Sequence, residues 1–213
     1  MELVRQKAYR RTFDLARSTL EELPIEERLA KAGVVFSRKG DVYSITVPFF
    51  DDTIDLAIPG FSFRSAKGFN ITLTTKIIIL HYLIHASGDP LGAALVPYED
   101  IPGCRSYLPV FERRVVKPLI GAFGYSRDAF VAAGRELSGK EEEYGNGSFT
   151  LSAFPRLPIT FILWEGDDDF PPSVKVLFDR SINAYLPLED IVVISKMAAT
   201  RILKEARKTY GEE

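Results

Sequence analysis

The hydrophobic period of the chain changes at Gly33, and this change constrains the fold more than any other sequence feature. Before it, over residues 1–32, apolar side chains recur at helical spacing, and Pro24 suits the first turn of a second helix. After it, along residues 33–64, apolar and polar side chains alternate. We therefore expect a helical N-terminal segment followed by an antiparallel β-meander with one buried face.

The rest of the chain predicts further helices and a second set of strands. Residues 70–86 form a helix that is apolar almost all round, as in the centre of a core, and Asn70 is placed to cap it. Residues 159–164 read as a strand buried on both faces, residues 174–178 as its partner, and residues 189–208 as a long last helix. The predicted fold class is α+β, with a β-meander and a C-terminal β-hairpin packed against several helices.

Shorter elements are expected between these. They are an irregular connection, two amphipathic helices, a polar acidic loop and a short strand, at residues 90–109, 110–123, 128–137, 138–147 and 184–186. The length of 213 residues favours one domain over residues 1–213.

Composition excludes several functional classes. With Cys104 as its only cysteine, the chain is neither a disulfide scaffold nor, by its own ligands, an iron–sulfur protein. The net charge of −2 has no basic stripe, so nucleic acid is not an expected partner. The charged N-terminus is not a signal peptide, and the longest apolar run, residues 77–84, is too short to cross a membrane. A cytoplasmic protein is the expectation, and its oligomeric state stays open.

The first candidate for chemistry is the pair His81 and His85. Their spacing of four places both imidazoles on one face of a helix, where they can ligate a metal or a haem. Tyr82 follows the first histidine where a zinc protease has glutamate, so that class is not indicated. The alternative is a pair of histidines at the edge of the core, bonded to backbone carbonyls.

The second candidate is the acidic turn at residues 164–172, which follows a buried strand. It holds the only tryptophan, Trp164, and its oxygen-rich carboxylates, Glu165 and Asp167 first among them, are ligands that hard cations prefer. Its spacing is not that of a calcium-binding loop, and a charged hairpin turn that stays in solvent is the alternative. Glu165 ends an apolar run, so we expect it to be partly buried and partnered.

The third candidate lies after the partner strand and contains Arg180 and Tyr185. The Arg180 guanidinium can pair with Glu165 or bind an anionic group as a planar fork. Cys104 lacks an evident base, so a catalytic role is not favoured. Five phenylalanines can line a ligand pocket, with the core of the sheet as the alternative: Phe49, Phe50, Phe61, Phe63 and Phe69.

Several short motifs in the last two-thirds of the chain carry a resemblance. They are LWEGD at 163–167, FPP at 170–172, LFD at 177–179 and YLP at 185–187, supported by residues 80–91 and 154–158. Over about residues 70–205 the chain resembles the domain-of-unknown-function family 3786, found mainly in anaerobic bacteria and archaea. Residues 70–213 are therefore taken as the family-like region.

This resemblance implies a setting rather than a reaction. Some relatives carry an added cysteine-rich iron–sulfur module like that of corrinoid iron–sulfur proteins, which this chain lacks. The family therefore implies a redox or iron–sulfur protein partner and a cofactor-related role in anaerobic metabolism.

Three functions follow as expectations. The first is a cofactor- or small-molecule-binding protein, with a tetrapyrrole (haem or corrinoid) held by His81 or His85 in a pocket with Trp164, Arg180 and Tyr185. The second is an enzyme that uses a metal or an acid–base pair at Glu165 and Asp167. The third is an accessory interaction domain that docks a basic partner on the acidic turn.

Overall fold

The structure is a computed structural model that describes residues 2–92 and 94–210. The chain forms two compact units. Unit 1 comprises Met1–Pro90, Phe154–Arg156 and Ala184–Pro187, and unit 2 comprises Leu91–Ala153, Leu157–Asn183 and Leu188–Glu213. The prediction of one domain over the whole chain stays a prediction. No helix in the described ranges is both long enough and apolar enough to cross a membrane.

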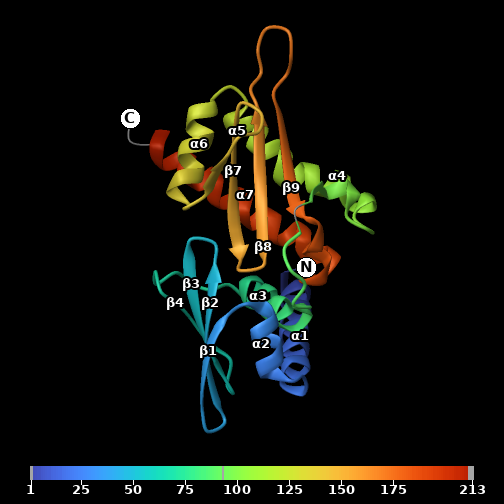
Figure 1. The fold of residues 1–213 in the computed structure, drawn as a ribbon, viewed down its shortest axis with the longest axis vertical. Coiled ribbons are helices and arrows are strands. Elements are labelled where there is room, and N and C mark those ends of the chain that lie inside the picture. Colours follow the sequence, from blue (N-terminus) through green and yellow to red (C-terminus); the bar gives the residue numbers. More distant parts are fainter. Residues whose placement is uncertain (1, 93, 211–213) are drawn as a thin grey trace. The chain divides into compact units, whose positions relative to one another are not determined.

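Unit 1 combines helices with a four-stranded antiparallel sheet, as the change of period at Gly33 predicts (Figure 1). The helices are α1 (Glu2–Glu22), α2 (Ile25–Ala32) and α3 (Leu73–His85). The strands pair in chain order and are β1 (Val35–Lys39), β2 (Val42–Phe49), β3 (Asp52–Ile58) and β4 (Ser62–Ser65).

Tyr82 of α3 lies at the centre of unit 1. It is fully buried, and its ring stacks on Phe154 with 4.1 Å between ring centroids. Its hydroxyl donates to the Ala32 carbonyl at 2.6 Å and accepts from the Arg156 amide at 3.1 Å. The prediction of α3 as a core helix is confirmed, although Thr72 rather than Asn70 caps it, by accepting from the Thr75 amide at 3.2 Å.

Unit 2 is built around a five-stranded sheet in the order β5-β9-β8-β7-β6. The strands are β5 (Leu95–Pro97), β6 (Lys140–Glu142), β7 (Gly147–Phe154), β8 (Leu157–Trp164) and β9 (Ser173–Asp179). The α-helices are α4 (Leu108–Phe111), α5 (Lys117–Phe123), α6 (Arg127–Glu136) and α7 (Leu188–Tyr210). Short 3₁₀ helices are η1 (Tyr98–Asp100), η2 (Arg105–Tyr107) and η4 (Arg180–Ala184), and the π-helix η3 (Glu112–Val116) joins α4 to α5. The central strand β8 is buried along most of its length, as its apolar run predicts.

These elements confirm the α+β class, the meander, the C-terminal hairpin β8–β9 and the long last helix, and they correct three local predictions. The connection at 90–109 contains β5, and the polar loop at 138–147 contains β6. Each of these strands is only three residues long and is defined by its hydrogen bonds to a longer neighbouring strand. A segment this short shows no hydrophobic periodicity from which it could be predicted. The strand expected at 184–186 is wrong, because Arg180–Ala184 forms a 3₁₀ turn.

Candidate docking surface at the loop end of unit 2

Three loops of unit 2 are fixed to one another by backbone hydrogen bonds. They connect α5 to α6, β6 to β7 and β8 to β9, and they are named the loop end here. The Asn146 amide donates to the Leu163 carbonyl at 2.8 Å, and the Gly166 amide donates to the Gly124 carbonyl at 2.9 Å. Because main-chain groups form these bonds, the relative position of the loops is set independently of surface side chains.

Glu165 occupies the junction of the three loops. Its Oε1 accepts from the Arg127 amide at 2.6 Å, and Arg127 is the first residue of α6. Its own amide donates to Asn146 Oδ1 at 3.0 Å. The first amides of a helix lack partners within the helix and carry partial positive charge, so this carboxylate is a long-range cap for α6.

Asp167 closes the turn that follows. Its Oδ1 accepts from the amides of Asp169 at 2.9 Å and Phe170 at 2.7 Å, while its own amide donates to the Phe170 carbonyl at 2.9 Å. Carboxylate oxygens of both Glu165 and Asp167 therefore bind main-chain amides. Within the described ranges no group of three or more His, Cys, Asp or Glu is placed to hold a metal ion. The metal-dependent enzyme that uses this pair stays a prediction.

Two glycines allow aromatic rings to lie against these loops. A Cβ at Gly166 would lie 2.6 Å from Tyr125 Cε1 and 2.6 Å from Pro172 Cδ, and a Cβ at Gly145 would lie 3.2 Å from Trp164 Cε2. Only glycine lets backbone and ring approach so closely. The motif from Trp164 to Pro172 is thus accounted for as a packing and capping unit.

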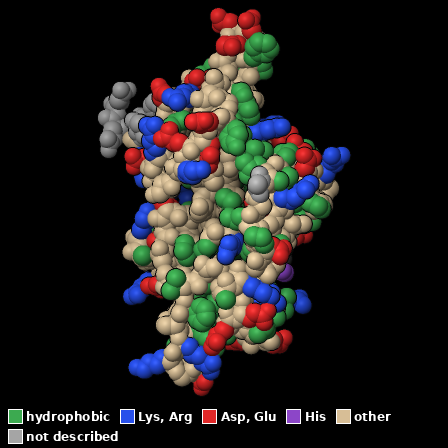
Figure 2. All heavy atoms as spheres, in the orientation of Figure 1, with side chains coloured by type: hydrophobic (Ala, Val, Ile, Leu, Met, Phe, Trp, Pro, Cys, Tyr) green, Lys and Arg blue, Asp and Glu red, His purple; other side chains and the backbone are tan. Residues whose placement is uncertain are grey.

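The aromatic side chains of the loop end are unusually exposed. Tyr125 is 73% exposed, Phe170 70%, Tyr144 46% and Trp164 38%, although all four lie on or beside fixed loops. Asp167, Asp168 and Asp169 lie on the β8–β9 loop with Phe170, and Figure 2 shows acidic and hydrophobic side chains gathered over that loop. These four aromatic residues and three aspartates are named the aromatic–acidic surface.

An acidic hollow adjoins this surface along β6. It has a volume of about 470 Å³ and is lined by residues 141–144. Glu141 pairs with Arg135, which lowers the pKa of that carboxyl, and Glu142 pairs with Lys140 at 3.2 Å. Tyr144 belongs both to this hollow and to the aromatic–acidic surface, while Glu141 and Glu142 are already paired with basic residues.

The histidines lie on the last turns of α3, in unit 1. His81 is half-buried and His85 exposed, and their ring centroids are 6.1 Å apart with the planes at 84°. Tyr185 also belongs to unit 1, where it is buried, donates its hydroxyl to the Asp89 carbonyl and stacks on Tyr82 at 6.0 Å.

Arg180 and Trp164 lie at opposite ends of the hairpin β8–β9. In the register Ile159 faces Phe178 and Trp164 faces Ser173, so Arg180 follows β9 at the end of the hairpin where β8 begins with Leu157. Eight residues of extended strand separate Leu157 from Glu165, which is roughly 25 Å. The suggested Arg180–Glu165 ion pair is therefore wrong. The assignment of His81, His85, Trp164, Arg180 and Tyr185 to one cofactor pocket stays a prediction.

Sequence reasoning missed several residues that build the loop end. Asn146 and Arg127 meet Glu165 from 19 and 38 residues away along the chain, a pairing that no local pattern reveals. Tyr125 and Tyr144 carried a signal, because each is an aromatic residue beside Gly124 or Gly145 in a predicted loop.

Comparisons with known proteins bear on this region. A family model described as "Domain of unknown function (DUF3786)" matches residues 24–201, which include the whole loop end. The comparisons with curated proteins and with solved structures found no match.

Proposed function

The chain belongs to the family described as Domain of unknown function (DUF3786), and we propose that it is an accessory protein that docks a basic, apolar-bearing segment of a partner protein on the aromatic–acidic surface. The observation that carries this proposal is four exposed aromatic rings beside three aspartates on loops fixed by main-chain hydrogen bonds. The proposal takes up the third of the functions expected from the sequence.

Aromatic residues that stay exposed on fixed loops suit an interface. Tyr, Trp and Phe are enriched in the cores of protein–protein interfaces and among the residues that dominate binding energy. Their loops are already ordered by contacts such as Asn146 to Leu163, so little conformational entropy is lost on binding.

The charge of the surface selects the partner. In the described part of the chain, neither Asp168 nor Asp169 forms an ion pair. Arg127, a cation of the same loop end, instead donates from its guanidinium to Asp128 at 2.7 Å and to the Asn146 carbonyl at 2.9 Å. The aspartates therefore remain open to cations of a partner. Lysine or arginine can pair with them and lie over the aromatic rings, while an acidic partner is repelled.

Trp164 provides a direct assay, because it is the only tryptophan and lies within the surface. We expect its fluorescence to change on titration with a helical peptide of leucine and lysine, and not with the same peptide carrying glutamate for lysine. Asp168→Asn with Asp169→Asn should weaken binding about fivefold to tenfold at low salt, and Phe170→Ala about tenfold. Asp14→Asn with Asp41→Asn, an equal charge change on exposed residues of unit 1, is the control.

The natural partner is identified with a photo-crosslinking residue at position 170 in an extract of the source cells. The expected product contains a basic segment of one protein and decreases with salt and with the paired Asp168 and Asp169 substitutions. Equal binding of the glutamate peptide, or crosslinks to segments without excess basic residues, would refute the proposal.

The second candidate is a cofactor held by His81 or His85, with a tetrapyrrole as its most concrete form. The supporting observation is that both imidazoles lie on the last turns of α3, where His81 is half-buried and His85 exposed. One histidine is sufficient as the axial ligand of a tetrapyrrole. An absorption spectrum and metal analysis after anaerobic purification test it. A chromophore or metal that His81→Ala with His85→Ala removes supports the candidate, and a colourless, metal-free protein that gains neither on reconstitution argues against it.

A further inference from the structure

Unit 1 contains a hollow between β4 and the first turn of α3, and two of the five phenylalanines that the sequence suggests for a pocket, Phe63 and Phe69, line it. Its volume is about 250 Å³, and its walls include Phe63, Arg64, Phe69, Asn70 and Lys76. We propose that this hollow binds a small aromatic anion, an aryl group that carries one carboxylate or phosphate. Phe49 and Phe61, in contrast, are buried in the core.

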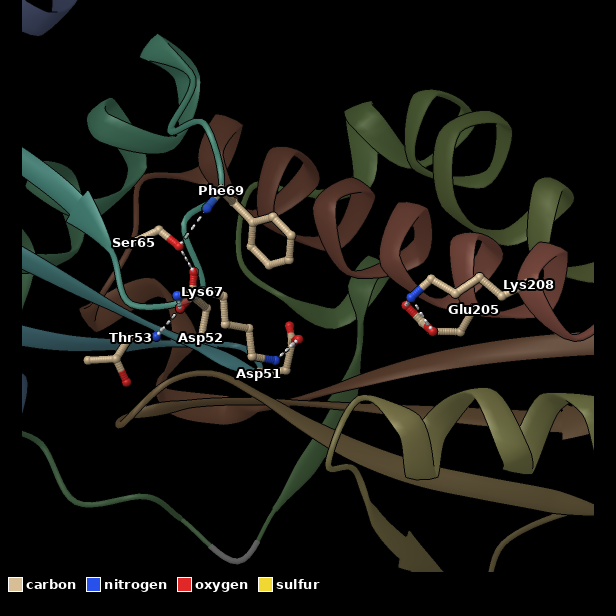
Figure 3. A network of polar contacts seen from close by, with 8 residues as sticks. All are labelled: Asp51, Asp52, Thr53, Ser65, Lys67, Phe69, Glu205 and Lys208. Carbon is tan, nitrogen blue, oxygen red and sulfur yellow. Dashed lines mark hydrogen bonds and ion pairs between the residues drawn. The ribbon is translucent and has the colours of Figure 1, made fainter.

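The wall that carries Phe69 is fixed by hydrogen bonds (Figure 3). The Phe69 amide donates to Ser65 Oγ at 3.0 Å, and Ser65 Oγ donates to Asp52 Oδ2 at 2.5 Å. Asp52 Oδ1 accepts in turn from the amides of Thr53 and Lys67 at 2.7 and 3.2 Å. The Phe69 ring turns away from these contacts and is 63% exposed. A hydrophobic ring held in solvent by an ordered loop is a preformed contact for an apolar ligand.

Phe63 supplies a second aromatic ring to the lining. It lies on β4 opposite Leu56 of β3, and its ring is 6.3 Å from the ring of Phe13 in α1. These contacts hold the ring, which also lines the hollow. A planar ligand therefore meets one aromatic side chain from β4 and another from the loop that follows it.

Lys76 gives the hollow its charge preference. Its Nζ is 5.5 Å from the Phe63 ring centroid, and in the described part of the chain it forms no ion pair with a carboxylate. Arg64, by comparison, pairs with Asp55 at 3.0 Å. Lys76 is also the fourth residue of α3, at a helix N-terminus without an acidic residue in its first turn. A cation is unfavourable beside that partial positive charge, and a bound anion offsets both.

The size of the hollow limits the ligand. Binding sites for drug-sized molecules have volumes of about 300–1,000 Å³, so a hollow of about 250 Å³ fits a single aromatic ring with one anionic group. Asn70 also lines the hollow, and an asparagine side chain has an NH₂ group from which an anionic oxygen can accept.

Ligand-observed saturation-transfer NMR on the full chain tests this with benzoate and phenyl phosphate as probes. Benzylamine keeps the ring and reverses the charge, and acetate keeps the charge without the ring. We expect binding of at least one aryl anion and none of benzylamine or acetate at the same concentration. The stronger of the two anions identifies the ligand as a carboxylate or a phosphate.

Variants localise the signal. Lys76→Gln and Phe69→Leu should each raise the dissociation constant about tenfold, while Lys39→Gln, the same change on exposed β1, should leave it unchanged. Amide chemical shifts of residues 63–76 report both the fold of each variant and the position of the ligand. Equal binding of benzylamine, absence of any aryl-anion signal, or unchanged affinity in a folded Lys76→Gln protein overturns the proposal.

Discussion

Replacing Glu165 tests whether this residue stabilises the fold or carries out chemistry. In Glu165→Ala the Arg127 amide loses an acceptor at 2.6 Å, and the N-terminus of α6 loses a nearby negative charge. Loss of a helix cap costs about 0.5–2 kcal/mol, and loss of a favourable charge at a helix N-terminus about 0.3–1 kcal/mol. These effects overlap, so we expect the free energy of unfolding to fall by about 1.5 kcal/mol.

Glu165→Gln separates the two effects. The amide oxygen of glutamine still accepts from Arg127, so only the charge is lost, and the expected cost is about 0.3–1 kcal/mol. Glu136→Ala is the control, because Glu136 is exposed at the other end of the same helix. A negative charge there opposes the helix dipole, so its removal should be neutral or slightly stabilising.

Two measurements decide the outcome. Urea denaturation gives the free energy of unfolding, and amide hydrogen exchange at residues 127–130 gives the local opening of α6, expected to be about tenfold faster in Glu165→Ala. If Glu165→Ala changes stability by less than about 0.3 kcal/mol and leaves exchange at Arg127 unchanged, the capping role is refuted. Any activity later found that Glu165→Gln abolishes in a stable protein would favour the enzyme hypothesis.

Three further predictions concern packing and burial. Gly166→Ala places a Cβ 2.6 Å from Tyr125 Cε1 and Pro172 Cδ, and urea denaturation should show a free energy of unfolding lower by about 1–3 kcal/mol. Gly121 is the control, because a Cβ at this helix position meets nothing within 4 Å, and Gly121→Ala should stabilise the protein by up to about 1 kcal/mol. Equal effects of the two substitutions would contradict this packing. Tyr82→Phe leaves the Ala32 carbonyl and the Arg156 amide without their buried partner, and it should lower the free energy of unfolding by about 2–4 kcal/mol. Tyr125 is exposed, so the control Tyr125→Phe should cost under about 0.5 kcal/mol. A loss for Tyr82→Phe as small as that of the control would disprove the role of the buried hydroxyl. Burial raises the pKa of the Cys104 thiol, so its alkylation at pH 8 should be far slower in the native protein than in the urea-unfolded protein. Because the thiol of the unfolded chain ionises first, the free energy of unfolding should fall as pH rises above about 8.5. Equal alkylation rates in both states would show that the thiol is accessible.

Much of the local structure follows from the sequence because it depends on short-range periodicity. The apolar run in β8 and the helical spacing in α1, α3 and α7 each predict an element within a few residues of its observed bounds. The turn at Gly33 is also local, since its left-handed backbone (φ +69°) suits glycine. The strands β5 and β6 escape such reasoning, because hydrogen bonds from β9 and β7 define them.

The candidate sites divide in the same way. The sequence marks Trp164, Glu165 and Asp167 as unusual, but it suggests metal or acid–base chemistry for the two carboxylates. Tertiary structure gives their oxygens main-chain amides as partners, including the Arg127 amide 38 residues away. It likewise separates buried Phe49 from exposed Phe69, although both are phenylalanines near the same sheet.

The sequence by itself therefore determined the class of fold, the main elements and the residues that stand out in composition. Only the tertiary structure decided which loops meet, which carboxylates are caps and which aromatic rings stay in solvent. The physical reason is that periodicity and propensity act over a few neighbouring residues. Capping by Glu165 and burial at the centre of unit 1 depend instead on groups that are distant in the chain and that folding brings together.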